Sequence, residues 1–155
     1  LIIWVREYPE VALEISPAGK LGIVLANGLA VPPAGTLVPD KPVLTGWNPD
    51  DPNRLALARE LGRIPPELLN DVSEIVPDPS NAYPDRIRIY TRSRFEVVTT
   101  VSKLGEKLPY LDSIVENREP GLLTLLDADT YTPFSALQSP TEDLEGSPPE
   151  AEKTE

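Results

Sequence analysis

Residues 84–134 read PDRIRIYTRSRFEVVTTVSKLGEKLPYLDSIVENREPGLLTLLDADTYTPF, and this stretch decides the fold. Polar and apolar residues alternate over 86–90 and, less strictly, over 95–101. Such alternation is typical of strands with one buried face, and residues 91–94 between the two runs supply a tight turn. The pattern therefore predicts a β-hairpin.

The predicted hairpin is followed by a segment with helical spacing. Apolar residues three or four positions apart predict a helix over 106–118, with Pro109 in its first turn, where proline is tolerated. A Pro-Gly pair ends this helix. A continuous apolar run over 122–126 and a short segment over 128–134 then predict two further strands, joined by an Asp-Ala-Asp turn.

The N-terminal part predicts short strands joined by turns. Strand-like runs cover 1–7, 11–15, 20–26 and 29–31. The Asn-Gly pair before the last run is the strongest turn signal in the chain, because both residues accept positive φ. Residues 36–48 look irregular, and Trp47 is expected to pack against the core rather than to hold a ligand.

A second helix is predicted over 52–61. Asp51 is a favourable N-cap, and Pro52 suits the first helical position. Gly62 is expected just past the end of this helix, and a further strand follows over 72–76.

These elements predict an α+β fold, in which a mixed, mostly antiparallel sheet of short strands carries the two helices packed on one face. One domain is expected over 1–134. Residues 135–155 contain almost no apolar side chains, so a disordered acidic tail is expected there. The predicted core comprises Ile15, Ile23, Leu25, Leu44, Leu61, Ile75, Ile87, Ile89, Val97, Leu108, Leu111, Val115, Leu123 and Leu125.

Composition excludes several classes of function. The 155 residues include no Cys and no His, which excludes thiolate catalysis, Cys or His zinc sites and triads with a histidine base. The net charge is −11, and −6 remains on residues 1–135 without the acidic tail. No cluster of Lys and Arg is visible, so nucleic acid is not an expected partner. The chain lacks an initiator Met and a run that could cross a bilayer, and we expect a piece of a longer protein.

Three motifs occur in a characteristic order. The first is VREYPEVA at 5–12, followed by the hairpin ending in Asn-Gly. The second is PVLTG at 42–46, followed by a helix and VSEI at 72–75. The third is a strand hairpin followed by KLPYLDSIV at 107–115 and a closing strand. Over roughly residues 4–134 this series resembles the extracytoplasmic part of the FtsQ/DivIB cell-division proteins, and more narrowly the β domain and acidic tail of the DivIB branch found in Bacillus-type bacteria.

The resemblance implies a single-pass membrane protein whose transmembrane helix is absent from this fragment. It implies a POTRA domain before the β domain, and residues 1–8 could be the end of that domain. It also implies a scaffold without enzymatic activity or cofactors, which binds the bitopic proteins FtsL and DivIC (FtsB in Gram-negative bacteria) at the division septum of the cell membrane.

The family's contact lies around the last strand of the sheet and the helix beside it. Carried over to this chain, the partner-binding residues are Arg118, Glu119, Leu123, Leu125, Tyr131 and Phe134. Tyr131 and Phe134 would be aromatic anchors, although closing the core is the alternative role for both. Pro133 has no N–H, so a partner strand could not pair cleanly through that position.

Other functions are compatible with parts of the sequence. Catalysis could use one of three acidic pairs: Asp127 with Asp129, Glu74 with Asp78, or Asp50 with Asp51. Asp127 and Asp129 could also bind Ca²⁺, but a turn explains this pair more simply, and an N-cap explains Asp50 and Asp51. The aromatic residues could instead form a cell-wall or carbohydrate-binding module, although they are spread along the chain.

Overall fold

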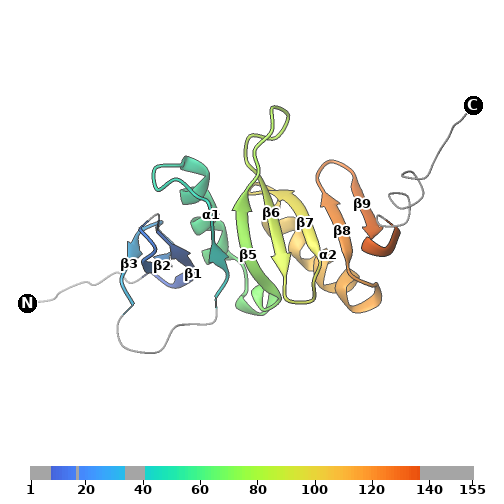
Figure 1. Cartoon of the computed structure of the whole chain (residues 1–155), viewed down its shortest axis with the longest axis horizontal. Helices are drawn as coiled ribbons and strands as arrows, with labels where there is room; N and C mark the ends of the chain where they lie inside the picture. The colour runs from blue at the N-terminus through green and yellow to red at the C-terminus, as the bar shows by residue number, and fades with distance from the viewer. Residues whose placement is uncertain (1–7, 17, 34–40, 137–155) are drawn as a thin grey trace, which may run out of the picture.

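The computed structural model describes residues 8–16, 18–33 and 41–136, which form one nine-stranded sheet with two helices on one face (Figure 1). The predicted strand over 1–7 and residues 137–155 of the predicted tail (135–155) lie outside the described residues. The first two residues of that predicted tail, Ser135 and Ala136, are described and belong to a short helical turn after β9. In chain order the elements are β1 (Glu10–Ile15), β2 (Leu21–Leu25), β3 (Ala30–Val31), β4 (Val43–Leu44), α1 (Pro52–Arg63), the short 3-10 helix η1 (Pro66–Leu69), β5 (Val72–Pro77), β6 (Arg86–Thr91), β7 (Glu96–Thr100), α2 (Leu104–Asn117), β8 (Gly121–Leu125) and β9 (Asp129–Pro133).

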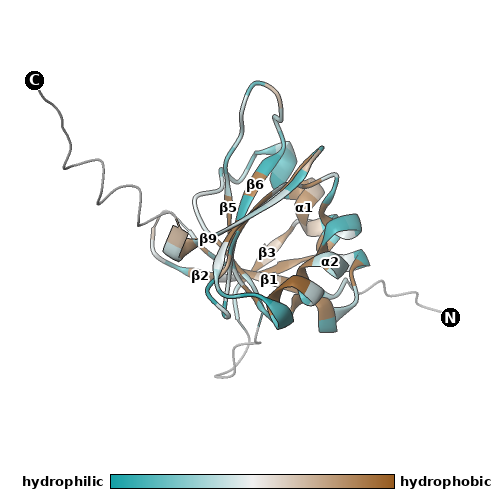
Figure 2. Cartoon of the chain, turned by 90° about the vertical axis from the view of Figure 1, so that its right-hand side faces the viewer, coloured by the Kyte–Doolittle hydropathy of each residue, from teal (hydrophilic) through white to brown (hydrophobic). Residues whose placement is uncertain are grey.

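The strand order is β3-β2-β1-β4-β5-β6-β7-β8-β9, so β3 and β9 are the two edges of the described sheet. Neighbours β1 and β4, β4 and β5, and β7 and β8 are parallel, while the other described pairs are antiparallel. Figure 2 shows both helices on the same side of the sheet. The predicted α+β fold with a mixed, mostly antiparallel sheet is confirmed.

Strand β4 corrects the prediction that residues 36–48 are irregular. Val43 and Leu44 pair in parallel with β1 on one side and with β5 on the other, and so join the two halves of the sheet. A strand of two residues is too short to show a period-2 pattern in the sequence, so it could not be predicted. It is a strand because it pairs with β1 and β5 on its two sides. Trp47 is buried as predicted, and its indole N–H donates to the Ile75 carbonyl (3.1 Å).

Helix α1 begins as predicted. The Asp51 side chain accepts a hydrogen bond from the backbone N–H of Asn53 (2.9 Å), as an N-cap does. The prediction that Gly62 lies past the helix end is wrong, because α1 runs to Arg63. The reason is packing: a Cβ on Gly62 would lie 2.8 Å from the Cβ of Ala26, so glycine lets the helix approach the N-terminal hairpin closely.

Helix α2 begins at Leu104, two residues before the predicted start, and ends at Asn117. Pro109 therefore lies in the second turn, and the prediction that it occupies the first turn is wrong. The backbone N–H of Lys103 already bonds to the Thr100 carbonyl (3.1 Å), and the Leu104 side chain is buried. Burial of that leucine against the sheet explains the early start.

Most predicted core residues are buried. This holds for Ile23, Leu44, Leu61, Ile75, Ile87, Ile89, Val97, Leu108, Leu111, Leu123 and Leu125, whereas Leu25 and Val115 are half-buried. Ile15 is 48% exposed, so its placement in the core was wrong. Its neighbour Glu14 faces Arg54 on α1, and alternation along β1 directs Ile15 to the face that the helices do not cover.

Candidate protein-interaction site

The edge strand β9 pairs with β8 on one side. Its register places Tyr131 opposite Leu123 and Asp129 opposite Leu125. Directly opposed residues of an antiparallel pair point to the same face of the sheet. Because Leu123 and Leu125 are buried in the core cluster, Tyr131 and Asp129 point to the face covered by the helices.

The backbone of β9 leaves a defined set of groups on the open edge. The Phe134 N–H donates to the Pro120 carbonyl (3.2 Å) just beyond the strand. Hydrogen-bonded and non-bonded pairs alternate along an antiparallel pair, so Thr130 and Thr132 bond to β8. The N–H and C=O of Asp129 and Tyr131 therefore face away from β8, toward the open edge.

Tyr131 is the central side chain of this edge. Its hydroxyl donates to the Glu119 carbonyl (2.6 Å), and the Arg118 guanidinium lies over its ring, 5.1 Å from the centroid. Its ring also contacts Phe95 of the β6–β7 turn at a centroid distance of 6.5 Å. Tyr131 is half-buried and packs against the core, so it closes the core and still borders the surface. No sequence pattern indicated this role for Phe95, which was expected only as part of a strand.

A hollow of about 210 Å³ lies beside this edge, between the end of α2 and β8–β9. Leu123 and Leu125, which are almost fully buried, line this hollow. The complete lining is Ile114, Arg118, Leu123, Leu125, Asp129, Thr130 and Tyr131. Four of the six residues expected to bind a partner thus meet in one place, and Ile114 joins them.

The other two predicted site residues lie next to this hollow. Phe134 is half-buried and opens a helical turn directly after β9. The Glu119 carboxylate accepts a hydrogen bond from the Ser135 hydroxyl (2.7 Å), so the segments on both sides of the edge strand are joined. All six residues therefore lie at one end of the sheet.

The acidic residues considered for catalysis have other partners. Asp127 pairs with Lys103, the N-cap residue of α2 (3.4 Å), and Asp129 pairs with Lys107 inside that helix (2.9 Å). Asp78 pairs with Arg86 and Arg88 on β6, at 3.3 and 3.2 Å. No group of three potential metal ligands occurs among the residues that the structure describes.

Similarity to known proteins identifies the family. No family model matches the chain. The cell division protein DivIB of Paenibacillus polymyxa is 46% identical over 135 residues, which make up 86% of this chain and 53% of that protein. DivIB of Solibacillus silvestris is 31% identical over 140 residues, or 86% of this chain and 48% of that protein. The chain belongs to the DivIB family of cell division proteins.

A solved structure agrees with this assignment. The major extracytoplasmic domain of the trans isomer of DivIB from Geobacillus stearothermophilus matches with a TM-score of 0.59 and 26% identity, covering 74% of this chain and all of that domain (100%). The present chain spans about half the length of the curated DivIB proteins it matches. Among the described residues, no helix combines the length and the apolar character that a membrane span requires.

Proposed function

We propose that this DivIB-family domain is a non-enzymatic scaffold of the division machinery, which binds the extracytoplasmic segments of FtsL and DivIC. The parent protein would be anchored in the cell membrane by a helix outside this fragment, with the domain on the extracytoplasmic side at the septum. The observation that supports the proposal most directly is the open edge of β9, with its outward backbone groups beside an apolar-floored hollow.

The chemistry of this edge suits an added strand. Asp129 and Tyr131 offer N–H donors and carbonyl acceptors, while Pro133 offers an acceptor alone. A partner strand would therefore pair with the first part of β9 and diverge near Pro133. The hollow beside it would take one apolar side chain of the partner, and Arg118 at its rim would favour an acidic neighbour.

The carbohydrate-binding alternative needs exposed aromatic side chains on one surface. Trp47 is buried, and the exposed Tyr90 and Tyr110 come from β6 and α2. Tyr90 opposes Glu74 and Glu96 on neighbouring strands, whereas Tyr110 lies beside Lys107 on the helix layer. These aromatics therefore lie on different layers of the domain and build no common platform.

An NMR titration of the domain with the FtsL and DivIC extracytoplasmic segments tests the proposal. We expect the largest shift changes at 129–133 and near Arg118. The double variant Tyr131→Ala/Phe134→Ala should bind more weakly, provided that its spectrum remains that of a folded protein. Shift changes confined to the opposite edge at β3, or full affinity of the folded double variant, would refute the site.

A further inference from the structure

The β8–β9 turn lies at the same end of the sheet as the β5–β6 loop (Figure 1), and its side chains contact that loop and the start of α2. The Asp127 carboxylate accepts a hydrogen bond from the Tyr83 hydroxyl (2.7 Å) and pairs with the Lys103 ammonium (3.4 Å). Two residues further on, Asp129 pairs with Lys107 (2.9 Å). We call these five residues, Tyr83, Lys103, Lys107, Asp127 and Asp129, the turn cluster.

Lys103 is the N-cap residue of α2, and Lys107 lies one helical turn further on, inside the helix. Asp127 lies in the β8–β9 turn, and Asp129 is the first residue of β9. Residues four apart on a helix lie above one another, so the two ion pairs can form side by side. The Lys107 side chain is only 11% exposed, and so it is held against the protein along most of its length. The turn is thus joined to α2 at two points.

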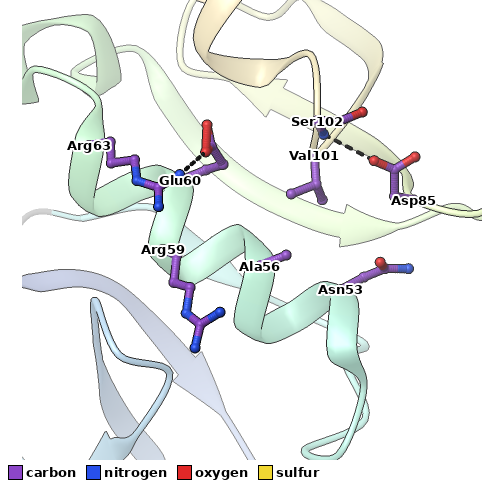
Figure 3. A pocket seen from close by; sticks show the side chains of 8 residues that line it. All are labelled: Asn53, Ala56, Arg59, Glu60, Arg63, Asp85, Val101 and Ser102. Carbon is purple, nitrogen blue, oxygen red and sulfur yellow. Dashed lines mark hydrogen bonds and ion pairs between the residues drawn. The ribbon is translucent and has the colours of Figure 1, made fainter.

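Tyr83 reaches the same turn from a loop that is itself fixed. The Pro84 carbonyl accepts a hydrogen bond from the Asn53 side chain of α1 (3.1 Å). The Asp85 carboxylate accepts one from the Ser102 N–H (3.0 Å), as Figure 3 shows at the rim of a hollow of about 290 Å³. The Tyr83 hydroxyl is therefore a donor held in position by α1 and by the β7–α2 connection.

We propose that the turn cluster positions the edge strand β9 for its partner, and that Asp127 acts as a positioning residue without touching that partner. This inference rests on the proposed function. Among the described strands, β9 has a neighbour on one side only, so its other supports within this part of the chain come from its side chains and its turn. Tyr131 holds the middle of the strand, and the turn cluster holds its beginning.

The resistance of β9 to local opening should therefore depend on the negative charge of Asp127. The charged and titratable groups that face this carboxylate are Tyr83 from the β5–β6 loop, Lys103 at the N-cap of α2 and Lys107 inside that helix. All the pairs are near the surface, so added salt should weaken them.

Amide hydrogen exchange of the partner-free domain tests the first step. In Asp127→Asn, the exchange of the Thr130 and Thr132 amides, which bond to β8, should become about two- to fivefold faster. The pKa of the Tyr83 phenol should also fall toward its ordinary value, because the carboxylate that raises it is gone. Asp112→Asn, on the exposed face of α2, is the matched control and should change neither quantity.

A charge swap tests whether the ion pair itself is responsible. Lys103→Asp should accelerate exchange in β9, and Lys103→Asp with Asp127→Lys should restore much of the protection. Unchanged exchange in Asp127→Asn, or a double variant no better protected than either single variant, would overturn the inference.

The partner measurement separates the two proposals. If the wild-type domain binds FtsL and DivIC at β9, Asp127→Asn should weaken binding by a factor similar to its exchange effect, about two- to fivefold. If the wild-type domain binds no partner there, the proposed function fails, while the exchange experiments still decide the role of the turn cluster in ordering β9.

Discussion

The Arg118 guanidinium lies over the Tyr131 ring at 5.1 Å from its centroid, while the Tyr131 hydroxyl donates to the carbonyl of the adjacent Glu119. One aromatic side chain thus joins the edge strand to the residues that end α2. A cation over an aromatic face and a hydrogen bond at the ring's far end fix both the position and the rotation of that ring. The edge of the sheet and the end of the helix should therefore open together.

Tyr131→Phe tests the hydrogen bond at this junction. The substitution keeps the ring and its contact with Arg118 but removes the donor to Glu119. Unfolding free energy should fall by about 0.5–1.5 kcal/mol, the net value of a typical hydrogen bond. Denaturant titration measures this, and Tyr110→Phe, on an exposed ring of α2, should leave the midpoint unchanged.

Tyr131→Pro, compared with Tyr131→Ala, isolates the backbone of the edge. Both variants lose the aromatic ring of Tyr131. Only proline also removes the outward backbone N–H and places its pyrrolidine ring at that position. If the partner adds a strand at β9, as proposed, the proline variant should bind at least several-fold more weakly than the alanine variant. Calorimetry with the FtsL and DivIC segments measures the difference, and equal affinities would count against strand addition.

Local signals in the sequence were sufficient for most of the fold. The alternation in β6 and the Asp51 N-cap were each readable within a few residues, because local contacts determine them. The prediction was wrong where residues far apart in the sequence determine the local structure or the burial of a side chain. Strand β4 exists because β1 and β5 lie on both sides of it, and Ile15 is exposed because no helix covers its face of the sheet.

The candidate site was predictable in part for the same reason. The resemblance to a known family indicated the last strand and its aromatics, but it did not indicate Phe95 or Ile114. The turn cluster brings together Tyr83, Lys103 and Asp127, which are separated by about twenty residues or more along the chain. Nothing in the local pattern distinguishes these residues from ordinary surface groups, so only the fold identifies them.

Gly121 at the start of β8 should tolerate no side chain. A Cβ there would lie 2.8 Å from the Pro133 Cα and 2.9 Å from the Tyr131 ring, and would also meet the Thr132 carbonyl. Gly121→Ala should therefore push β9 outward and lower the unfolding free energy by about 1–3 kcal/mol. Gly105→Ala in α2 is the control: its Cβ would meet only the end of the Glu60 side chain, at 3.4 Å, and alanine favours a helix by up to about 1 kcal/mol. A denaturant titration should therefore show a lower unfolding free energy for Gly121→Ala and a higher one for Gly105→Ala, each relative to the wild type.

The Glu14–Arg54 ion pair joins β1 to α1 beneath the surface. The two side chains are 15% and 7% exposed, and Arg54 makes two bonds to Glu14 (2.7 and 2.8 Å) and one to the Gly28 carbonyl (2.8 Å). Glu14→Gln leaves a buried guanidinium without its counter-charge and should cost about 3–5 kcal/mol of stability. Glu60→Gln, which breaks the exposed pair with Arg63, should cost at most about 1 kcal/mol. A similar loss in both variants would show that burial contributes little.

The turn cluster should stabilise the domain over a wide pH range and fail at both extremes. The hydrogen bond from Tyr83, and then the interaction with Lys103, lower the pKa of Asp127 below its ordinary 3.8, so this contribution is present above that value and is lost as pH falls through the lowered pKa. The hydrogen bond to Asp129 raises the pKa of Lys107 above 10.5, and the hydrogen bond to Asp127 raises that of Tyr83 above 10.0. Both contributions are therefore present below those values and are lost as pH rises through the raised pKa values.

The difference in melting temperature between the wild type and Asp127→Asn isolates the Asp127 part of this dependence, because most other titrations cancel. The difference should be constant near neutral pH and should shrink as the pH falls below 3.8 and through the lowered pKa of Asp127, where the wild-type carboxyl also becomes neutral. It should shrink again at high pH, as the pH rises through the raised pKa of Tyr83 and the phenol loses its proton. A difference that stays the same down to pH 2 would mean that the substitution acts through the shape of the turn and not through the charge of Asp127.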